Sequence, residues 1–320
     1  GPAGSDVCED MRIAHFPLNI AGYASRLAAA QRELGHEAVV YSRSTAPYNF
    51  PADVTLPPHT DPVRFNLNML RRLPELDDFD VLHVHGGIKR LELGYYALRG
   101  PKVFVNYHGT ETRHGFGLYH QRLADALFYT PADLKPYLPY KAVWIPQPID
   151  FKAIQRTGTY TNERPVFLHL RSSDKGEADI VRMFDAAFGP LEMATYEGQK
   201  YYTGKDAELR VFGGLSHTRA IFEMSFADVV FDQFTPHGIY GYVAVEAMAL
   251  GKPVLATVDY RLYPDDCPVL YPNPAKLAEL ADDENLRREY GERGRRYVER
   301  VHEATKVAQT TIQAYQQTFK

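Results

Sequence analysis

The sequence contains no run of the roughly 18 apolar residues that a membrane-spanning helix requires, and it does not begin with a basic segment followed by an apolar one. We therefore expect a cytoplasmic protein. Cys8 and Cys267 are the only cysteines, so a disulfide framework is excluded and a cysteine-rich zinc site has too few thiolates. A formal net charge of -4 lacks the positive field of nucleic-acid-binding proteins, and we expect no nucleic-acid partner.

The composition is that of a globular protein with real cores. Hydrophobic residues make up 45% and charged residues 24% of the chain. A length of 320 residues exceeds a typical single core and favours two α/β domains. We interpret residues 1–10 as a cloning remnant, because strand-like sequence begins directly at Met11.

Short apolar strands alternate with helical patterns along the first half of the chain. A helix is predicted over 21–34, where apolar residues recur at helical spacing until Gly35. Strands are predicted at 11–16, 37–41, 81–85 and 102–106. Such alternation favours a parallel, doubly wound sheet of the Rossmann-like kind, whose ligands bind at the carboxyl ends of the strands.

A second series of the same kind follows a stiff connection at Pro146-Gln147-Pro148. We place the boundary near Asp150, which gives domains at 11–150 and 151–320. The second series has strands predicted at 166–170, 209–212, 229–232 and 254–256, with helices between them and terminal helices from about 284 to 320.

The most informative segment is residues 237–254, in which a glycine-containing loop leads into a helix and then a strand. Backbone N–H groups at Tyr240, Gly241 and Tyr242, together with the positive end of the helix dipole, suit a diphosphate. Glu246 lies inside this predicted helix, and its carboxylate can accept hydrogen bonds from both ribose hydroxyls of a nucleotide. The alternative is that Glu246 is an ordinary solvated helix residue.

The stretch from Tyr240-Gly241 through Glu246 to Pro253-Val254 resembles the donor-binding signature of the family-four glycosyltransferases, which have the GT-B fold. Supporting matches run in family order at Ala21-Gly22, Asp80 to Gly86, Tyr107-His108-Gly109, Ile145 to Asp150 and Lys175-Gly176. The resemblance implies two facing Rossmann-like domains, with the acceptor bound mainly by 11–150 and the nucleotide sugar by 151–320. It also allows the C-terminal helix to cross back to the first domain.

The resemblance further implies a retaining hexosyltransferase that moves a sugar, most plausibly from a UDP-sugar, to a hydroxyl of a saccharide, natural product or lipid-linked acceptor. No cofactor and no metal ion is then required.

Particular residues take on roles through this resemblance. Arg171 and Lys175 correspond to a cationic pair on the diphosphate, where positive charge stabilises the leaving nucleotide. His108 corresponds to a contact with the transferred sugar, and Glu111 to a residue that reaches the acceptor. Gly22 would let the backbone approach phosphate or acceptor without a Cβ clash. Read without the family, Arg171 and Lys175 are surface charges near a strand end.

One position departs from the family pattern. The usual pair of glutamates separated by seven residues would place its first carboxylate at Gly238. This departure motivates a second hypothesis, a non-catalytic sugar-nucleotide binder or partner subunit. A third is an epimerase or phosphorylase on the same fold, since fold alone does not fix the reaction.

Two other patterns have ordinary structural interpretations. His83 and His85 alternate on a predicted strand without a carboxylate or cysteine cluster, and we expect core or cleft-wall histidines rather than metal ligands. The arginines at 287, 288, 293, 295 and 296 are interspersed with glutamates, which indicates a salt-bridged solvent face. Peripheral contact with a membrane surface is the second interpretation of this stretch.

Overall fold

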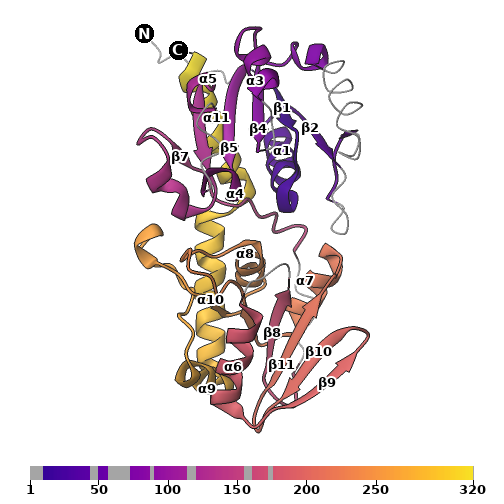
Figure 1. Cartoon of the computed structure of the whole chain (residues 1–320), viewed down its shortest axis with the longest axis vertical. Helices are drawn as coiled ribbons and strands as arrows, with labels where there is room; N and C mark the ends of the chain where they lie inside the picture. Colours follow the sequence, from indigo (N-terminus) through magenta and orange to yellow (C-terminus); the bar gives the residue numbers. More distant parts are fainter. Residues whose placement is uncertain are drawn as a thin grey trace, which may run out of the picture.

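The computed structural model of the chain describes residues 10–43, 50–56, 73–86, 90–113, 120–154, 161–171 and 176–319. These residues form two α/β halves placed end to end along the longest axis of the molecule (Figure 1). We call the part built on the first sheet the first half and the part built on the second sheet the second half.

Within the described residues, the first sheet has seven strands in the order β3-β2-β1-β4-β5-β6-β7, and all its pairings are parallel. The strands are β1 (Arg12–Phe16), β2 (Glu37–Arg43), β3 (Val54–Leu56), β4 (Val81–His85), β5 (Lys102–Tyr107), β6 (Ala126–Tyr129) and β7 (Val143–Trp144). Every residue of β4 is buried, as expected for a parallel strand that is covered on both faces. The strand order reverses between β1 and β4, where doubly wound sheets bind ligands.

The second sheet has the order β13-β12-β8-β11-β10-β9 in the described part of the chain. Its strands are β8 (Val166–Arg171), β9 (Glu192–Tyr196), β10 (Gln199–Thr203), β11 (Glu208–Gly213), β12 (Val229–Phe231) and β13 (Val254–Leu255). The pairings among β13, β12, β8 and β11 are parallel, whereas β10 pairs antiparallel with both β11 and β9. The prediction of helices between the strands is therefore incomplete, because a β9–β10 hairpin forms the edge of this sheet.

Helices cover both sheets. They are α1 (Tyr23–Glu33), α3 (Arg90–Ala97), α4 (Thr110–Arg113), α5 (His120–Leu123), α6 (Glu177–Phe188), α7 (His217–Phe226), α8 (Tyr242–Ala249), α9 (Pro274–Asp282), α10 (Glu284–Val301) and α11 (Ala304–Phe319), with short 3₁₀ turns at Ile20–Gly22, Leu73–Leu76, Ala132–Tyr137 and Tyr260–Leu262. None of the described helices combines the length and apolar character needed to cross a membrane.

Two glycines let α10 pack closely against the region around α8. A Cβ at Gly291 would lie 2.0 Å from the carbonyl oxygen of Gly251, and a Cβ at Gly294 would lie 3.0 Å from the side chain of Met248. The contact with the Gly251 backbone explains why a helix of strong helix formers contains Gly291. The predicted salt-bridged face of α10 is present in part, as the exposed ion pairs Arg293–Glu289 and Arg296–Glu292. Arg295 instead packs toward α8, where it donates to the carbonyl of Ala249.

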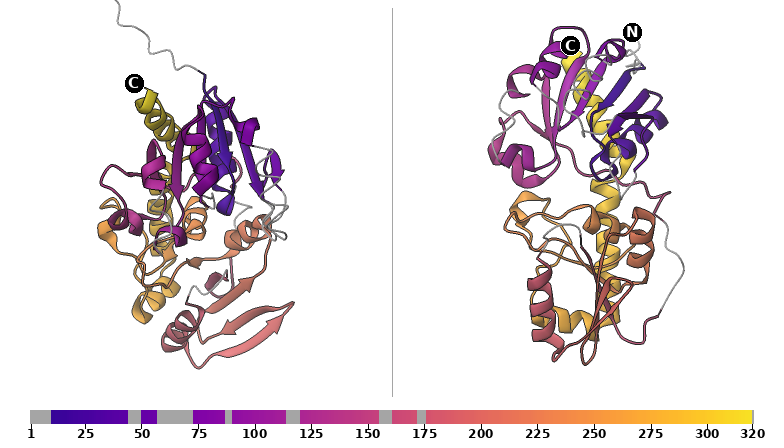
Figure 2. Two further views of the ribbon diagram at one scale, coloured as in Figure 1. Left: turned by 45° about the horizontal axis from the view of Figure 1, so that its top comes forward. Right: turned by 45° about the vertical axis from the view of Figure 1, so that its right-hand side comes forward.

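The last helix, α11, crosses from the second half to pack against α1 and β5 of the first half. Figures 1 and 2 show this yellow helix lying along the first sheet. Its buried residues Val307, Ile312 and Tyr315 join the core formed by β1 and α1. The expected return of the C-terminal helix is thereby confirmed.

The two connections between the halves are hydrogen-bonded to each other. Ile149 donates its N–H to the carbonyl of His302 at 2.8 Å, and Ala304 donates to the carbonyl of Ile149 at 3.0 Å. The predicted boundary at Asp150 lies next to this contact, between β7 and β8.

Candidate active site

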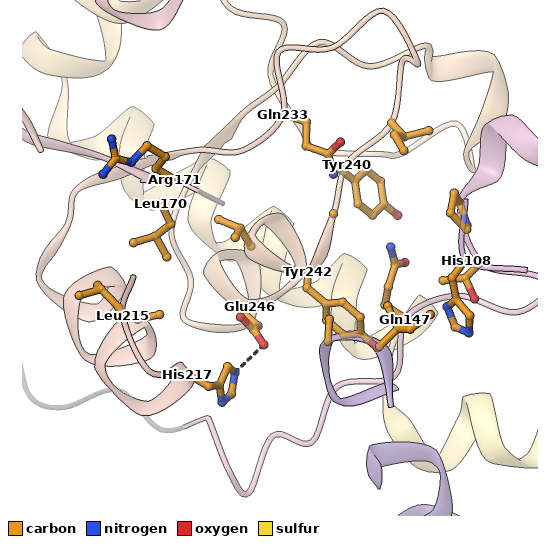
Figure 3. Close-up of a pocket in the computed structure, with 18 of the residues that line it drawn as sticks. His108, Gln147, Leu170, Arg171, Leu215, His217, Gln233, Tyr240, Tyr242 and Glu246 are labelled. Carbon is orange, nitrogen blue, oxygen red and sulfur yellow. Dashed lines mark hydrogen bonds and ion pairs between the residues drawn. The ribbon is translucent and has the colours of Figure 1, made fainter. Parts of the chain in front are cut away.

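A cavity of about 610 Å³ lies between the two halves and is lined by residues from both of them. Its polar lining includes His108, Arg113, Gln147, Arg171, His217, Gln233 and Glu246, most of which Figure 3 labels. Several of these residues come at or just after strand ends: His108 follows β5, Arg171 ends β8 and Gln233 follows β12. The cavity therefore occupies the carboxyl edges of both sheets, where ligands of open α/β sheets bind.

Glu246 is buried in this cavity and already carries two strong interactions. Its Oε1 accepts a hydrogen bond from Nη2 of Arg26 at 2.6 Å and another from Nε2 of His217 at 2.8 Å. Burial by itself would raise the pKa of Glu246, but Arg26 and His217 outweigh it and lower that pKa. Glu246 is therefore an ionised buried carboxylate and not the solvated helix residue of the alternative interpretation.

Arg26 reaches Glu246 from α1 of the first half and does not itself line the cavity. Its guanidinium lies 4.7 Å from the ring centroid of Tyr242 and 5.6 Å from that of Phe50, so aromatic faces cover the ion pair. Sequence reasoning missed both Arg26 and His217. The partners lie 220 and 29 residues from Glu246, and nothing in the local pattern around either residue marks it.

The loop before α8 holds its three predicted residues in different ways. Gly241 donates its N–H to Oδ2 of Asp232 at 2.5 Å, and a Cβ here would lie 2.5 Å from Nε2 of Gln233, so a side chain at this position would displace the Gln233 amide. The Tyr240 hydroxyl lies 2.9 Å from the Tyr297 hydroxyl, inside the second half. Because the hydroxyl is directed into the core, Tyr240 lines the cavity as part of its wall. Tyr242 begins α8 and also lines the cavity.

Gly238 has no room for the carboxylate that the family pattern would place there. Its φ of +66° lies in the left-handed region, and a Cβ would come within 3.0 Å of Cβ of Asp259. The backbone N–H of Asp259 also donates to the carbonyl of Gly238 at 2.9 Å. The backbone at this position therefore favours glycine over glutamate, and Gly238 does not line the cavity.

Arg171 lines the cavity at the end of β8 with 42% of its side chain exposed. Among the described residues it pairs with Glu177, 3.8 Å away at the start of α6, and this long contact leaves the guanidinium accessible to a ligand. Gly213 on the neighbouring strand makes room for it, since a Cβ there would lie 2.8 Å from Nε of Arg171. Lys175 lies outside the described residues, so its place beside Arg171 stays a prediction.

The first-half residues of the predicted site are placed as follows. His108 lines the cavity, and burial lowers its pKa to about 3, so the imidazole is neutral at pH 7. Gly22 has φ +76°, and a Cβ at this position would lie 2.5 Å from the ring of Phe50. This close packing is a structural reason for a glycine at position 22. The approach of the Gly22 backbone to a ligand stays a prediction. Glu111 belongs to α4, but its side chain lies outside the described residues.

A cavity at the facing carboxyl edges of two Rossmann-like sheets, with the last helix crossing back, defines the GT-B architecture. Comparisons with known proteins agree with this assignment. Residues 20–133 match the model of the glycosyl transferase 4-like domain. This match covers most of the first sheet and includes Gly22, Arg26 and His108.

Solved structures with this architecture resemble the chain over nearly its whole length. A glycosyltransferase from Rickettsia africae superposes with a TM-score of 0.67 at 12% identity, over 98% of this chain and 99% of its own. Sucrose-phosphate synthase from Thermosynechococcus elongatus gives 0.66 at 16%, over 97% and 99%. Anabaena HepE in complex with UDP and glucose gives 0.65 at 13%, over 95% and 99%. No curated protein sequence matches the chain. The GT-B fold predicted from the motifs is thereby confirmed.

Proposed function

We propose that this protein is a retaining glycosyltransferase that moves a hexosyl group from a nucleoside diphosphate sugar, with uridine favoured, to a hydroxyl acceptor. The observation that carries the proposal is the buried, ionised Glu246 on α8, at the wall of a cavity that also holds Arg171 and His108. The glycosyltransferase match of the first half supports the same reaction class. The uridine preference draws support from HepE, whose structure contains UDP.

In this proposal the nucleotide binds mainly to the second half. Oε2 of Glu246 accepts hydrogen bonds from the ribose hydroxyls, while Arg26 and His217 hold the other oxygen. The diphosphate lies between the N-terminus of α8, at Tyr242 and Val243, and the cations Arg171 and Lys175. These two cations supply the positive charge, so that the reaction proceeds without a metal ion or cofactor.

The reaction then needs no protein nucleophile. The bond between the anomeric carbon and the diphosphate oxygen breaks as the acceptor hydroxyl oxygen bonds to the same face of that carbon. An oxygen of the leaving diphosphate takes the hydroxyl proton. Arg171 and Lys175 stabilise the negative charge that grows on this leaving group. His108 contacts the transferred sugar. Glu111, which belongs to the predicted acceptor domain 11–150, contacts the acceptor.

A thermal-shift screen against the diphosphates of uridine, guanosine, adenosine and thymidine tests the donor site. A ligand at about 100 times its Kd should add roughly 2.7 kcal/mol to the free energy of unfolding. We expect the largest shift with UDP. No shift with any of the four would contradict the donor site. Transfer from the matching sugar nucleotide, followed by NMR of the fresh product, then tests retention through the anomeric configuration.

A non-catalytic sugar-nucleotide binder is the second candidate, because Gly238 leaves no space for the carboxylate expected there. This candidate predicts that UDP stabilises the protein in the thermal-shift screen as expected for the donor site, but that no sugar is transferred to any acceptor. Conversion of the sugar nucleotide without an acceptor would instead indicate an epimerase or phosphorylase. The acceptor itself, whether saccharide, natural product or lipid-linked glycan, is identified by transfer assays, and for a lipid-linked one also by membrane-vesicle binding.

A further inference from the structure

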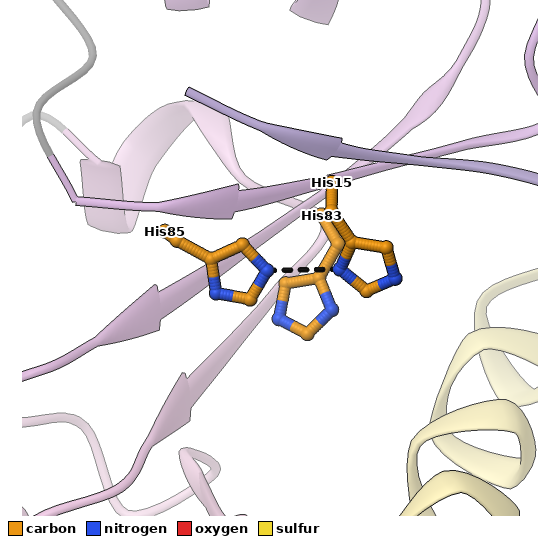
Figure 4. A group of neighbouring side chains, drawn as sticks. All are labelled: His15, His83 and His85. Atoms are coloured by element: carbon orange, nitrogen blue, oxygen red, sulfur yellow. Dashed lines mark hydrogen bonds between the residues drawn. The ribbon is translucent and has the colours of Figure 1, made fainter. Parts of the chain in front are cut away.

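A chain of hydrogen bonds runs through the first half from α1 to the cavity. Nε2 of His15 on β1 lies 2.7 Å from Oε1 of Gln31 on α1, and Nδ1 of His15 lies 2.9 Å from Nε2 of His85. Nδ1 of His85 in turn lies 3.1 Å from Nε2 of His108. Figure 4 shows the contact between His15 and His85 on neighbouring strands. Gln31, His15 and His85 are fully buried, so the chain connects an interior amide to a cavity residue.

The amide of Gln31 fixes the direction of this chain. Its Nε2 donates to the hydroxyl of Tyr315 at 3.4 Å, which turns Oε1 toward His15. An amide oxygen can only accept, so Nε2 of His15 carries the hydrogen. A neutral imidazole has one N–H, and Nδ1 of His15 must therefore accept from Nε2 of His85.

The same reasoning reaches His108. Because the single hydrogen of neutral His85 is on Nε2, its Nδ1 accepts, and Nε2 of His108 is the donor. Nδ2 of Asn106 is a competing donor, 3.2 Å from the same nitrogen. Its two hydrogens have other acceptors in Oγ1 of Thr130 at 2.9 Å and the carbonyl of Tyr107 at 3.3 Å, so donation by Nε2 of His108 to His85 leaves the Asn106 amide satisfied.

A metal ion is the competing explanation for so many buried histidines. Ligand nitrogens of His15, His83 and His85 lie within 4.8 Å of one another. Among the described residues, however, no carboxylate or thiolate belongs to this group to offset the charge of a divalent cation. Both ring nitrogens of His15 and of His85 already have protein partners. The contacts thus favour hydrogen bonding over coordination.

We propose that Gln31, His15 and His85 are positioning residues that hold His108 in the Nε2–H tautomer, so that its Nδ1 accepts a hydrogen bond from a hydroxyl of the bound sugar. The contact with sugar rests on the function proposed above, whereas the tautomer is a property of the free protein. A neutral imidazole can exist as either of two tautomers, and the Nδ1–H form of His108 would offer a donor where an acceptor is needed.

Long-range ¹H–¹⁵N correlation spectra of the free protein, labelled with ¹⁵N-histidine, report the tautomer directly. We expect His108 to be protonated at Nε2 alone, with its signal assigned by its loss in His108→Asn. In Gln31→Met, which removes the terminal amide but keeps the side-chain length, we expect a mixture of both tautomers. Phe104→Leu is the control, because it alters the same core without touching the chain of hydrogen bonds.

The inference is overturned by an Nδ1–H His108 in the native protein, by an unchanged spectrum in Gln31→Met, or by stoichiometric metal in the purified native protein. Kinetics provide a second readout. Gln31→Met should lower kcat about tenfold and leave the Kd for UDP unchanged. Tenfold is the lower end of the loss seen when a hydrogen-bond partner of a metal-bound histidine is removed. If the native protein transfers no sugar, the proposed function fails while the tautomer is still decided by the spectra. His85→Asn breaks the chain at its centre and should give the same mixture if Gln31→Met does not fold.

Discussion

Arg26 and Glu246 form a buried ion pair of 2.6 Å that joins the two halves of the molecule across 220 residues of sequence. Only 12% of the Arg26 side chain and 6% of the Glu246 side chain are exposed. Each charge is therefore separated from water, and its partner replaces the lost hydration. The donor site proposed on α8 is thus assembled in part by α1.

Removal of Arg26 should destabilise the fold, because Glu246 would remain as a buried carboxylate with only His217 as partner. We expect Arg26→Ala to lower the free energy of unfolding by about 3 kcal/mol, as measured by urea denaturation. Lys152→Ala is the matched control, since the Lys152–Glu33 pair also joins the halves but is 78% and 55% exposed. Its effect should be much smaller, because exposed ion pairs contribute little to stability. Equal effects of the two variants would contradict the importance of burial.

Glu246→Gln should weaken UDP binding about tenfold in isothermal titration calorimetry. The substitution keeps the shape of the side chain but replaces charge-assisted hydrogen bonds with neutral ones, a loss of about 1–2 kcal/mol. The control is Glu223→Gln, another ion-paired helix carboxylate of the second half, which does not line the cavity. Normal affinity in Glu246→Gln would refute the ribose assignment.

Arg171→Ala and Lys175→Ala should affect turnover more than binding. If both cations stabilise the leaving diphosphate, each variant should lower kcat by about 100-fold. Arg182→Ala, on the exposed face of α6, is the control and should leave both kcat and KM unchanged. Steady-state kinetics with a saturating acceptor separate the effects. A rise in KM with native kcat would assign the cations to ground-state binding alone.

Local patterns predicted the parts of the structure that depend on neighbouring residues. The predicted strands correspond to β1, β2, β4, β5, β8, β11, β12 and β13, and the predicted helix of Glu246 is α8. The short strands β3, β6 and β7 were not predicted. The crossing of the terminal helix was expected from the family resemblance. The β9–β10 hairpin was missed because all five β9 residues are exposed and lack an apolar alternation. Its turn depends on Glu197 and Gly198, both with positive φ, and Glu197 is an unusual residue for that conformation.

Other features of the site could not be predicted from the sequence, because they arise from contacts between segments that are distant along the chain. The pairing of Arg26 with Glu246 and the hydrogen bond between His217 and Glu246 depend on how the halves meet. The sequence shows that His83 and His85 share a strand face, and their burial as core histidines is confirmed. It does not show that His15 and Gln31 extend this cluster to form a directed chain, since that requires the parallel register of β1 with β4.

Gly238 should not tolerate the carboxylate found in the family pattern. Gly238→Ala already combines a left-handed backbone, which costs about 1–2 kcal/mol, with a contact of 3.0 Å to Asp259. The control Gly198→Ala has a similar φ of +76° but meets no atom within 4 Å, so it isolates the backbone contribution. We expect the larger loss of stability in Gly238→Ala, and no gain of activity in Gly238→Glu. Faster transfer by Gly238→Glu would instead show that the loop can adopt the family conformation.

Stability should fall as the pH drops from neutrality, because several buried histidines must stay neutral in the folded state. Burial lowers the pKa of His15 and of His302 to about 4, from the usual histidine value of 6.5. Between these values the unfolded chain binds protons that the folded chain does not, so the free energy of unfolding decreases as pH falls from 6.5 toward 4. Each of the two histidines contributes a slope of up to about 1.4 kcal/mol per pH unit.

Urea denaturation at pH 7, 6 and 5 measures this slope. The pKa of Glu246 is lowered, so this carboxylate loses its stabilising charge only below pH 4.5 and leaves the window unaffected. His15→Asn should reduce the slope by up to about 1.4 kcal/mol per pH unit. A free energy of unfolding that is constant from pH 7 to 5 would mean that water or a proton acceptor reaches these histidines. His15 would then not be held as a buried neutral imidazole, and the chain of hydrogen bonds could not fix the tautomer proposed for His108.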